Sequence, residues 1–236
     1  MKKTSIFCPG CGTIHEVVIL ENEPQTVQHI RPTQRPTTWL DIKKVIASGH
    51  AEEAFKIGDK ITTTLKNGQT VEFTVAAINP YGENQVAFVM EDLLDEAYSM
   101  NSTATNKNGW SGSELRHLLN TKIFDLLPDE LAAVIQPRKI TQNLKGKMVT
   151  SEDALWLPSY TEMFGDKYST DVDDVHFPLF NTYKSRVKNR QGVYEWYWLR
   201  SPLASSSTYF MVVYNNGSSY SNSANYSNGV SFGFLI

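Results

Sequence analysis

The chain has 236 residues, of which 41% are hydrophobic and 20% charged, a balance typical of a globular protein rather than a disordered one. Its formal net charge of -3 and its short, scattered basic clusters argue against a surface that binds nucleic acid. It has no apolar run of about eighteen residues and no hydrophobic signal-peptide core, so we expect no membrane insertion and a cytoplasmic or phage-particle location.

The first 35 residues are predicted to form an arm and a linker. Cys8 and Cys11 enclose a proline and a glycine, which is the pattern of a zinc knuckle. A structural zinc usually takes about four ligands, so His15, His29 or a second chain would have to complete the set. The alternative is a pair of reduced thiols. Prolines and threonines follow, and we place the domain boundary at residue 36.

The next elements are read from periodicity. Apolar residues recur at helical spacing from Trp39 onward and predict a helix. Asn67 and Gly68 predict a two-residue type I′ hairpin turn, because both tolerate a positive φ. Residues 71–75 alternate between apolar and polar and predict the returning strand, and residues 85–90 predict another.

The second half of the chain mixes helix and strand signals. Ser111 with Glu114, and Ser159 with Glu162, have the spacing of capping boxes and predict helix starts. Apolar runs predict strands at 135–141, 196–199, 209–213 and 230–236. Because helices and strands do not alternate regularly, the sequence predicts an α+β fold.

Between residues 201 and 229 the composition is dominated by serine, asparagine and tyrosine. Low-complexity disorder would explain the composition, but the apolar strands predicted on both sides argue against it. The segment could form the plain polar face of hairpins. It could equally form a binding surface, since tyrosine offers contact area and serine and asparagine offer adaptable hydrogen bonds. Composition alone does not separate these two interpretations.

Several motifs carry a resemblance to a known family. They are Phe55-x-Ile57-Gly58-Asp59, Met100-Asn101, Gly109-Trp110-x-x-Ser113-x-Leu115-Arg116, Leu127-Pro128-x-Glu130-Leu131, Leu155-Trp156-Leu157-Pro158-Ser159 and Trp198-Leu199-Arg200-Ser201-Pro202. In this order, over about residues 39–236, they resemble the bacterial and phage domain of unknown function DUF6273. None of the motifs is a catalytic signature.

Some members of this group resemble C-type-lectin-like proteins that retroelements diversify. The resemblance implies that residues 36–236 form a C-type-lectin-like domain, with short helices packed on small antiparallel sheets and a variable-like segment at 201–229. One departure is that Gly229-Val230 is followed by Ser231-Phe232, where such domains commonly have Arg-Pro.

The resemblance also implies a non-enzymatic protein that binds a protein or glycan ligand on a cell or particle surface. The side chains expected to contact the ligand are Tyr209, Tyr214, Asn215, Asn216, Ser218, Ser219, Tyr220, Asn222, Ser223, Asn225 and Tyr226.

Two other functions stay open. The chain could be a structural or particle-associated module, or a homo-oligomer that buries the same tyrosines between subunits. It could also be a metal-dependent enzyme, since Asp171, Asp173, Asp174 and His176 lie close together in the sequence and hard cations take clustered carboxylates. We assign no catalytic residue, because no phosphate-binding loop and no nucleophile elbow occurs.

Several aromatic and charged residues are better explained as structural. Trp110, Trp156, Trp196 and Trp198 are expected to fill the core. Arg200 is expected to fix loop carbonyls, with a clamp for a ligand carboxylate as its functional alternative.

Overall fold

The computed structural model describes residues 2–7, 14–19 and 36–236. In the N-terminal arm, β1 (Lys2–Phe7) and β2 (Ile14–Ile19) pair as an antiparallel hairpin. Cys8, Cys11 and His29 lie outside the described residues. His15 belongs to β2, where only the backbone is described. The zinc-knuckle prediction therefore stays a prediction.

An antiparallel sheet of four strands forms the centre of the domain. Its order is β15 (Gly233–Leu235), β5 (Val86–Met90), β4 (Thr70–Ile78) and β3 (Lys60–Thr64). The end of the chain thus returns to pair with β5, with Phe234 opposite Phe88. The final strand is shorter than the predicted 230–236, but the residues around it are all buried.

Helix α1 (Trp39–Ala47) packs on this sheet, as its helical spacing predicts. Thr38 caps the helix by accepting a hydrogen bond from the backbone N–H of Asp41. The Trp39 ring lies edge-on to Phe88 and Phe234, with centroids 5.6 and 5.7 Å away. Its indole N–H donates to Thr63 Oγ1 at 3.0 Å, so the buried ring has no unsatisfied donor.

The turn between β3 and β4 differs from the prediction. Gly68 has a φ of +92°, but Asn67 does not have a positive φ, so the turn is not type I′. The ladder ends with Thr64 opposite Thr70, and the Leu65 N–H bonds to the Gln69 carbonyl at 2.8 Å. The Asn67 side chain accepts from the Gln69 N–H at 3.0 Å, which stabilises the longer loop instead.

Short helical turns connect the sheets. They are α2 (Ala51–Ala54), α3 (Glu114–Leu118), η1 (Leu119–Ile123), η2 (Phe124–Leu126), α4 (Asp129–Ala132), α5 (Tyr160–Phe164), η3 (Pro178–Phe180) and α6 (Tyr183–Arg186). The capping box from Ser159 to Glu162 is confirmed. The one from Ser111 to Glu114 is wrong, because Ser113 is the N-cap and accepts from the Arg116 N–H.

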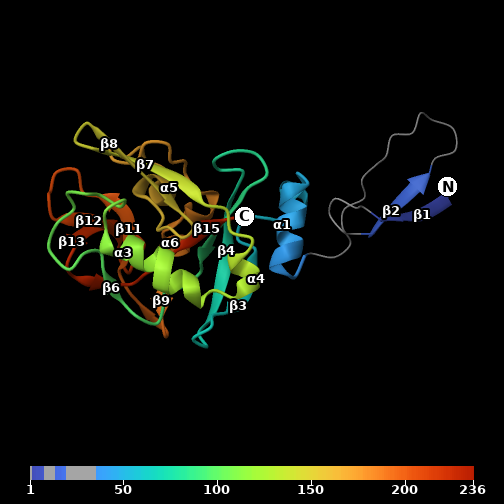
Figure 1. Ribbon diagram of the computed structural model, residues 1–236, viewed down its shortest axis with the longest axis horizontal. Helices are drawn as coiled ribbons and strands as arrows, with labels where there is room; N and C mark the ends of the chain where they lie inside the picture. The colour runs from blue at the N-terminus through green and yellow to red at the C-terminus, as the bar shows by residue number, and fades with distance from the viewer. Residues whose placement is uncertain (1, 8–13, 20–35) are drawn as a thin grey trace.

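The segment of greatest interest lies in a second antiparallel sheet. Its order is β11 (Tyr197–Pro202), β12 (Tyr209–Val213) and β13 (Ser219–Ser223). Figure 1 shows this sheet at the end of the domain farthest from α1. Two-stranded pairs complete the fold: β6 (Tyr98–Ser99) with β14 (Ser227–Asn228), β7 (Arg138–Leu144) with β8 (Lys147–Asp153), and β9 (Asn189–Arg190) with β10 (Val193–Tyr194).

The prediction of an α+β fold with short helices and small antiparallel sheets is confirmed. Within the described residues, no helix has both the length and the apolar character needed to cross a bilayer. Trp110, Trp156 and Trp198 are fully buried as expected. The expectation for Trp196 is wrong, because it is only partly buried and lies at the margin of the second sheet.

Candidate functional site

The second sheet rests on a buried cluster of charges. The capping box of α5 fixes Glu162, whose carboxylate accepts the Ser159 N–H at 2.8 Å. Arg200 extends from β11 and donates to both Glu162 oxygens at 2.7 Å and to the Leu157 carbonyl at 2.6 Å. Both side chains are fully buried. The cluster therefore ties the first strand of the second sheet to α5.

A second arginine and a second carboxylate complete this cluster. Arg138 on β7 donates to Glu162 at 2.6 Å and to Asp174 at 2.6 Å, and Arg200 also contacts Asp174. Burial alone would raise the pKa of Glu162, but the charges of Arg138 and Arg200 outweigh burial and lower it to about 2. Arg200 is thus occupied by carboxylates of its own chain and is not free to clamp a ligand.

The predicted acidic patch is divided by the fold. The Asp171 carboxylate accepts from Ser201 Oγ at 2.7 Å and from the Thr161 N–H at 3.1 Å. Burial, and next the charge of Asp174, raise the pKa of Asp171 to about 6. Asp174 bonds to the arginines, whereas Asp173 is exposed. In the described part of the chain, no group of three or more metal-ligand side chains comes together.

The serine-, asparagine- and tyrosine-rich segment forms β12, β13 and the turns at their ends. β12 is buried apart from its first residue, whereas every residue of β13 is at least partly exposed. Tyr209, Tyr220 and Tyr226 are 41%, 57% and 60% exposed. Their hydroxyl groups make no hydrogen bond with any other described residue, so they are free to bond a ligand.

Three aromatic rings gather where β12 turns into β13. Trp196 lies 4.4 Å from Tyr214 and 5.5 Å from Tyr220, measured between ring centroids. Tyr214 and Tyr220 are 6.1 Å apart. All three rings keep some exposure, so they form a partly open aromatic surface.

The turn from β12 to β13 is fixed by packing. Gly217 has a φ of +83°, and a Cβ there would lie 2.2 Å from the Tyr183 carbonyl oxygen. Arg186 Nε donates to the Gly217 carbonyl at 2.9 Å. The Asn216 side chain accepts from the backbone N–H and the hydroxyl of Ser218. Asn215 is exposed at the tip of this turn.

Some of the predicted ligand contacts also serve the backbone. Asn222 Nδ2 donates to Asn228 Oδ1 at 3.2 Å, and Ser223 Oγ donates to Asn225 Oδ1 at 2.8 Å. These bonds shape the turn that leads from β13 to β14. Ser219 is exposed on β13. The structure thus places the predicted contact residues on β13 and in the turns at its two ends, except Tyr209, which begins the neighbouring β12.

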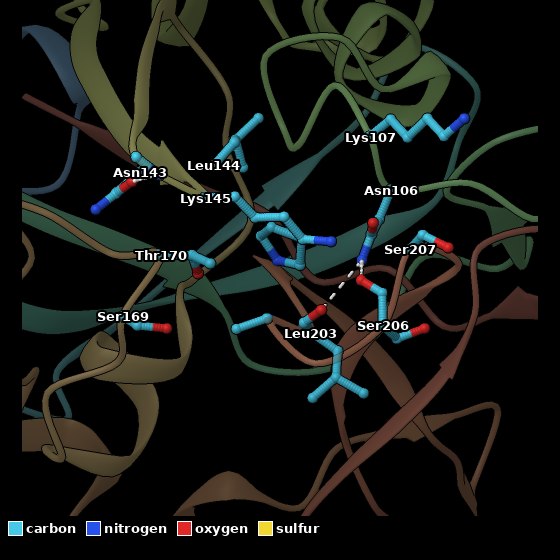
Figure 2. Close-up of a pocket in the computed structure, with 13 residues that line it drawn as sticks. Asn106, Lys107, Asn143, Leu144, Lys145, Ser169, Thr170, Leu203, Ser206 and Ser207 are labelled. Carbon is cyan, nitrogen blue, oxygen red and sulfur yellow. Dashed lines mark hydrogen bonds between the residues drawn. The ribbon is translucent and has the colours of Figure 1, made fainter.

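A pocket of about 250 Å³ lies beside this sheet and was not predicted. Figure 2 shows it between the β7–β8 turn, the loop that holds Ser169 and Thr170, and the loop between β11 and β12. Its lining residues are Asn106, Lys107, Asn143, Leu144, Lys145, Gly146, Ser169, Thr170, Pro202, Leu203, Ala204, Ser206 and Ser207.

Asn106 joins the pocket to the second sheet. Its Nδ2 group donates to the carbonyls of Leu203, Ser206 and Tyr209 at 3.3, 3.1 and 2.6 Å. Its backbone N–H donates to the Ser207 carbonyl at 2.8 Å. One buried asparagine therefore bonds to both ends and to the middle of the loop before β12. The sequence could not single it out, because its partners are backbone carbonyls about 100 residues away.

Comparison with known proteins gives one match. Residues 84–236 match the domain family described as "Domain of unknown function (DUF6273)". No curated protein and no solved structure matches the chain. The matched range contains the second sheet, the charge cluster and the pocket.

Proposed function

This chain belongs to the DUF6273 family, and we propose that it is a non-enzymatic binding protein. Its recognition surface is Tyr209 at the start of β12 together with the exposed side chains of β13 and of the turns at its two ends. We call this set of residues, from Tyr209 to Tyr226, the display surface. Its ligand is a protein or a glycan on a cell or particle surface.

The observation that carries the proposal is the contrast between the display surface and its support. All of β11 and most of β12 are buried, and Arg200 anchors β11 through the charge cluster. The adjoining β13 exposes Tyr220 and small polar side chains. A rigid base under adaptable polar and aromatic side chains is the arrangement of binding proteins, because little conformational entropy is lost on association.

We further propose that the fold is C-type-lectin-like and that residues 201–229 form a variable segment of the kind that retroelements diversify. The distribution of burial supports this idea. The flanking segments, Tyr197–Pro202 and 229–236, are buried scaffold, whereas the side chains that could change without cost to the core lie between them. A reverse transcriptase gene near the coding sequence, with a near-copy of its 3′ end differing at adenines, would establish diversification.

The binding proposal is tested with a panel of immobilised glycans and of bacterial cells. The chain is compared with a variant that carries Tyr209→Ala, Tyr220→Ala and Tyr226→Ala. Tyr194→Ala is the matched control, because Tyr194 is 62% exposed but lies outside the display surface. The proposal requires that the wild type and the control bind a common target that the triple variant does not bind, with unchanged thermal stability of all three.

One observation favours a second function, assembly into a homo-oligomer or particle. β13 is an edge strand, and no other described strand pairs with its outer side. Edge strands offer unpaired backbone groups to another chain, so a second copy could cover Tyr220 and its neighbours. Light scattering at several concentrations separates the two functions, since a strict monomer excludes assembly of identical subunits.

A further inference from the structure

The pocket beside the second sheet has a chemistry that the display surface lacks. Two of its lining residues are lysines, and none is an aspartate or glutamate. No described carboxylate lies within ion-pair distance of Lys107 or Lys145. Since an unpaired cation at a concave site attracts anions, the pocket favours a negatively charged group.

The Lys145 ammonium group is placed to reach a bound ligand. Lys145 occupies the β7–β8 turn with a φ of +55°, which sets the direction of its side chain. Figure 2 shows that side chain extending over the pocket toward Asn106. Lys107 follows Asn106 directly and lines the opposite rim, but its side chain extends away from the pocket in Figure 2.

Asn106 supplies a hydrogen-bond acceptor. Three backbone carbonyls surround its Nδ2 group, which fixes the orientation of the amide. The Oδ1 atom accepts no hydrogen bond from any described residue, although the residue is 7% exposed. This oxygen is not one of the fully buried side-chain atoms that have no partner, so it keeps contact with solvent and can accept a hydrogen bond from a ligand hydroxyl.

The rest of the lining is small, in part hydroxyl-bearing and in part apolar. Ser169, Thr170, Ser206 and Ser207 can exchange hydrogen bonds with hydroxyl groups, whereas Leu203 and its neighbour Pro202 offer aliphatic surface. The volume of about 250 Å³ lies below the roughly 300–1,000 Å³ of sites for drug-sized ligands. It suits one ring.

We propose that this pocket binds an acidic monosaccharide, such as a hexuronate. Lys145 binds its carboxylate, Asn106 Oδ1 and the hydroxyl side chains bind its hydroxyl groups, and Pro202 and Leu203 face its C–H groups. The proposal does not depend on the display surface, because the pocket contains none of the residues assigned to that surface.

The test is a ligand-observed NMR titration of the full chain with glucuronate, glucose, acetate and inorganic phosphate. Glucuronate is expected to bind at least about tenfold more tightly than each of the others, since it alone combines a charge-assisted hydrogen bond with contacts to a ring. Glucose lacks the carboxylate, and acetate and phosphate lack the ring.

Lysine variants provide the matched comparison. Lys145→Gln should weaken glucuronate binding at least about fivefold, because it removes one charge-assisted bond, whereas Lys147→Gln should not. Lys147 is exposed two residues away and does not line the pocket. The proposal is overturned if glucuronate does not bind, if glucose, acetate or phosphate binds as well, or if both lysine variants weaken binding equally.

Discussion

The rings of Trp196 and Tyr214 pack against each other, with centroids 4.4 Å apart and planes inclined by 52°. Trp196 precedes β11 and Tyr214 follows β12, so this contact joins the ends of two neighbouring strands. The contact also gives Tyr214 a role in the fold that differs from the role of the more exposed tyrosines. Tyr214 is partly structural, whereas Tyr209, Tyr220 and Tyr226 are mainly exposed.

Removal of exposed tyrosines should leave the fold intact. We expect the triple variant Tyr209→Ala, Tyr220→Ala and Tyr226→Ala to unfold at nearly the wild-type urea concentration. Phe210→Ala should cost about 3–5 kcal/mol, because Phe210 is fully buried. Urea unfolding followed by tryptophan fluorescence measures both. A large loss in the triple variant would show that these tyrosines support the core.

The turn at Gly217 should not tolerate a side chain. Gly217→Ala adds a Cβ 2.2 Å from the Tyr183 carbonyl oxygen at a φ of +83°. Gly68→Ala is the control, because Gly68 has a φ of +92° and open space around it. Both variants bear the backbone strain, which is about 1 kcal/mol, but only the first has a clash. Thermal unfolding of both variants should therefore show a larger loss of stability for Gly217→Ala. Equal losses of stability in the two variants would contradict the clash.

The buried charges should be sensitive to the loss of one partner. Glu162→Gln leaves Arg138 and Arg200 with one carboxylate, Asp174, and should cost about 3–5 kcal/mol. Lys44→Gln, which breaks the exposed pair of Lys44 with Asp41, should change stability little. The denaturant midpoints of the two variants measure both losses of stability. Similar small effects would mean that the cluster contributes little.

Asp171 and Glu162 should give stability opposite dependences on pH. The pKa of Asp171 is raised to about 6 in the folded chain, against about 3.9 when unfolded. The folded state therefore binds this proton more tightly, and Asp171 lowers stability as pH rises from about 4 to about 6. The pKa of Glu162 is lowered to about 2, so its contribution is lost as pH falls from about 4.3 toward 2.

Asp171→Asn isolates the first effect. Asparagine keeps an acceptor for Ser201 and for the Thr161 N–H but cannot ionise. The variant should therefore gain stability relative to the wild type as pH rises through this window. Urea midpoints at several pH values between 4 and 7 measure the difference. Parallel curves for the two proteins would contradict the raised pKa of Asp171.

Two elements that depend on residues close together in the sequence could be predicted from it. The helix at Trp39 and the capping box from Ser159 to Glu162 depend on neighbours within one or two turns, and both are confirmed. The turn at Asn67 and Gly68 is not type I′, because the strand register and the Asn67 side chain favour a longer loop. The sequence contains no information on that register.

The candidate site could be predicted only in part. The composition of residues 201–229 points to a polar surface with tyrosines, and the structure exposes Tyr209, Tyr220 and Tyr226 at the start of β12, on β13 and in the turn after it. Partners distant in sequence were missed: Arg200 meets Glu162 and Asp174, and Asn106 meets the carbonyl of Tyr209. Trp196 was expected in the core, because a tryptophan at the end of a buried strand has the same apolar pattern as one inside it.

Ligand binding by the display surface is the function proposed for this chain. The most direct measurement is the binding of the wild type, the Tyr194→Ala control and the triple tyrosine variant to one panel of immobilised glycans and bacterial cells. We expect a target that the first two proteins share and the third does not bind, at equal thermal stability of all three. Retention of that target by the triple variant, or no binding by the wild type, would contradict it.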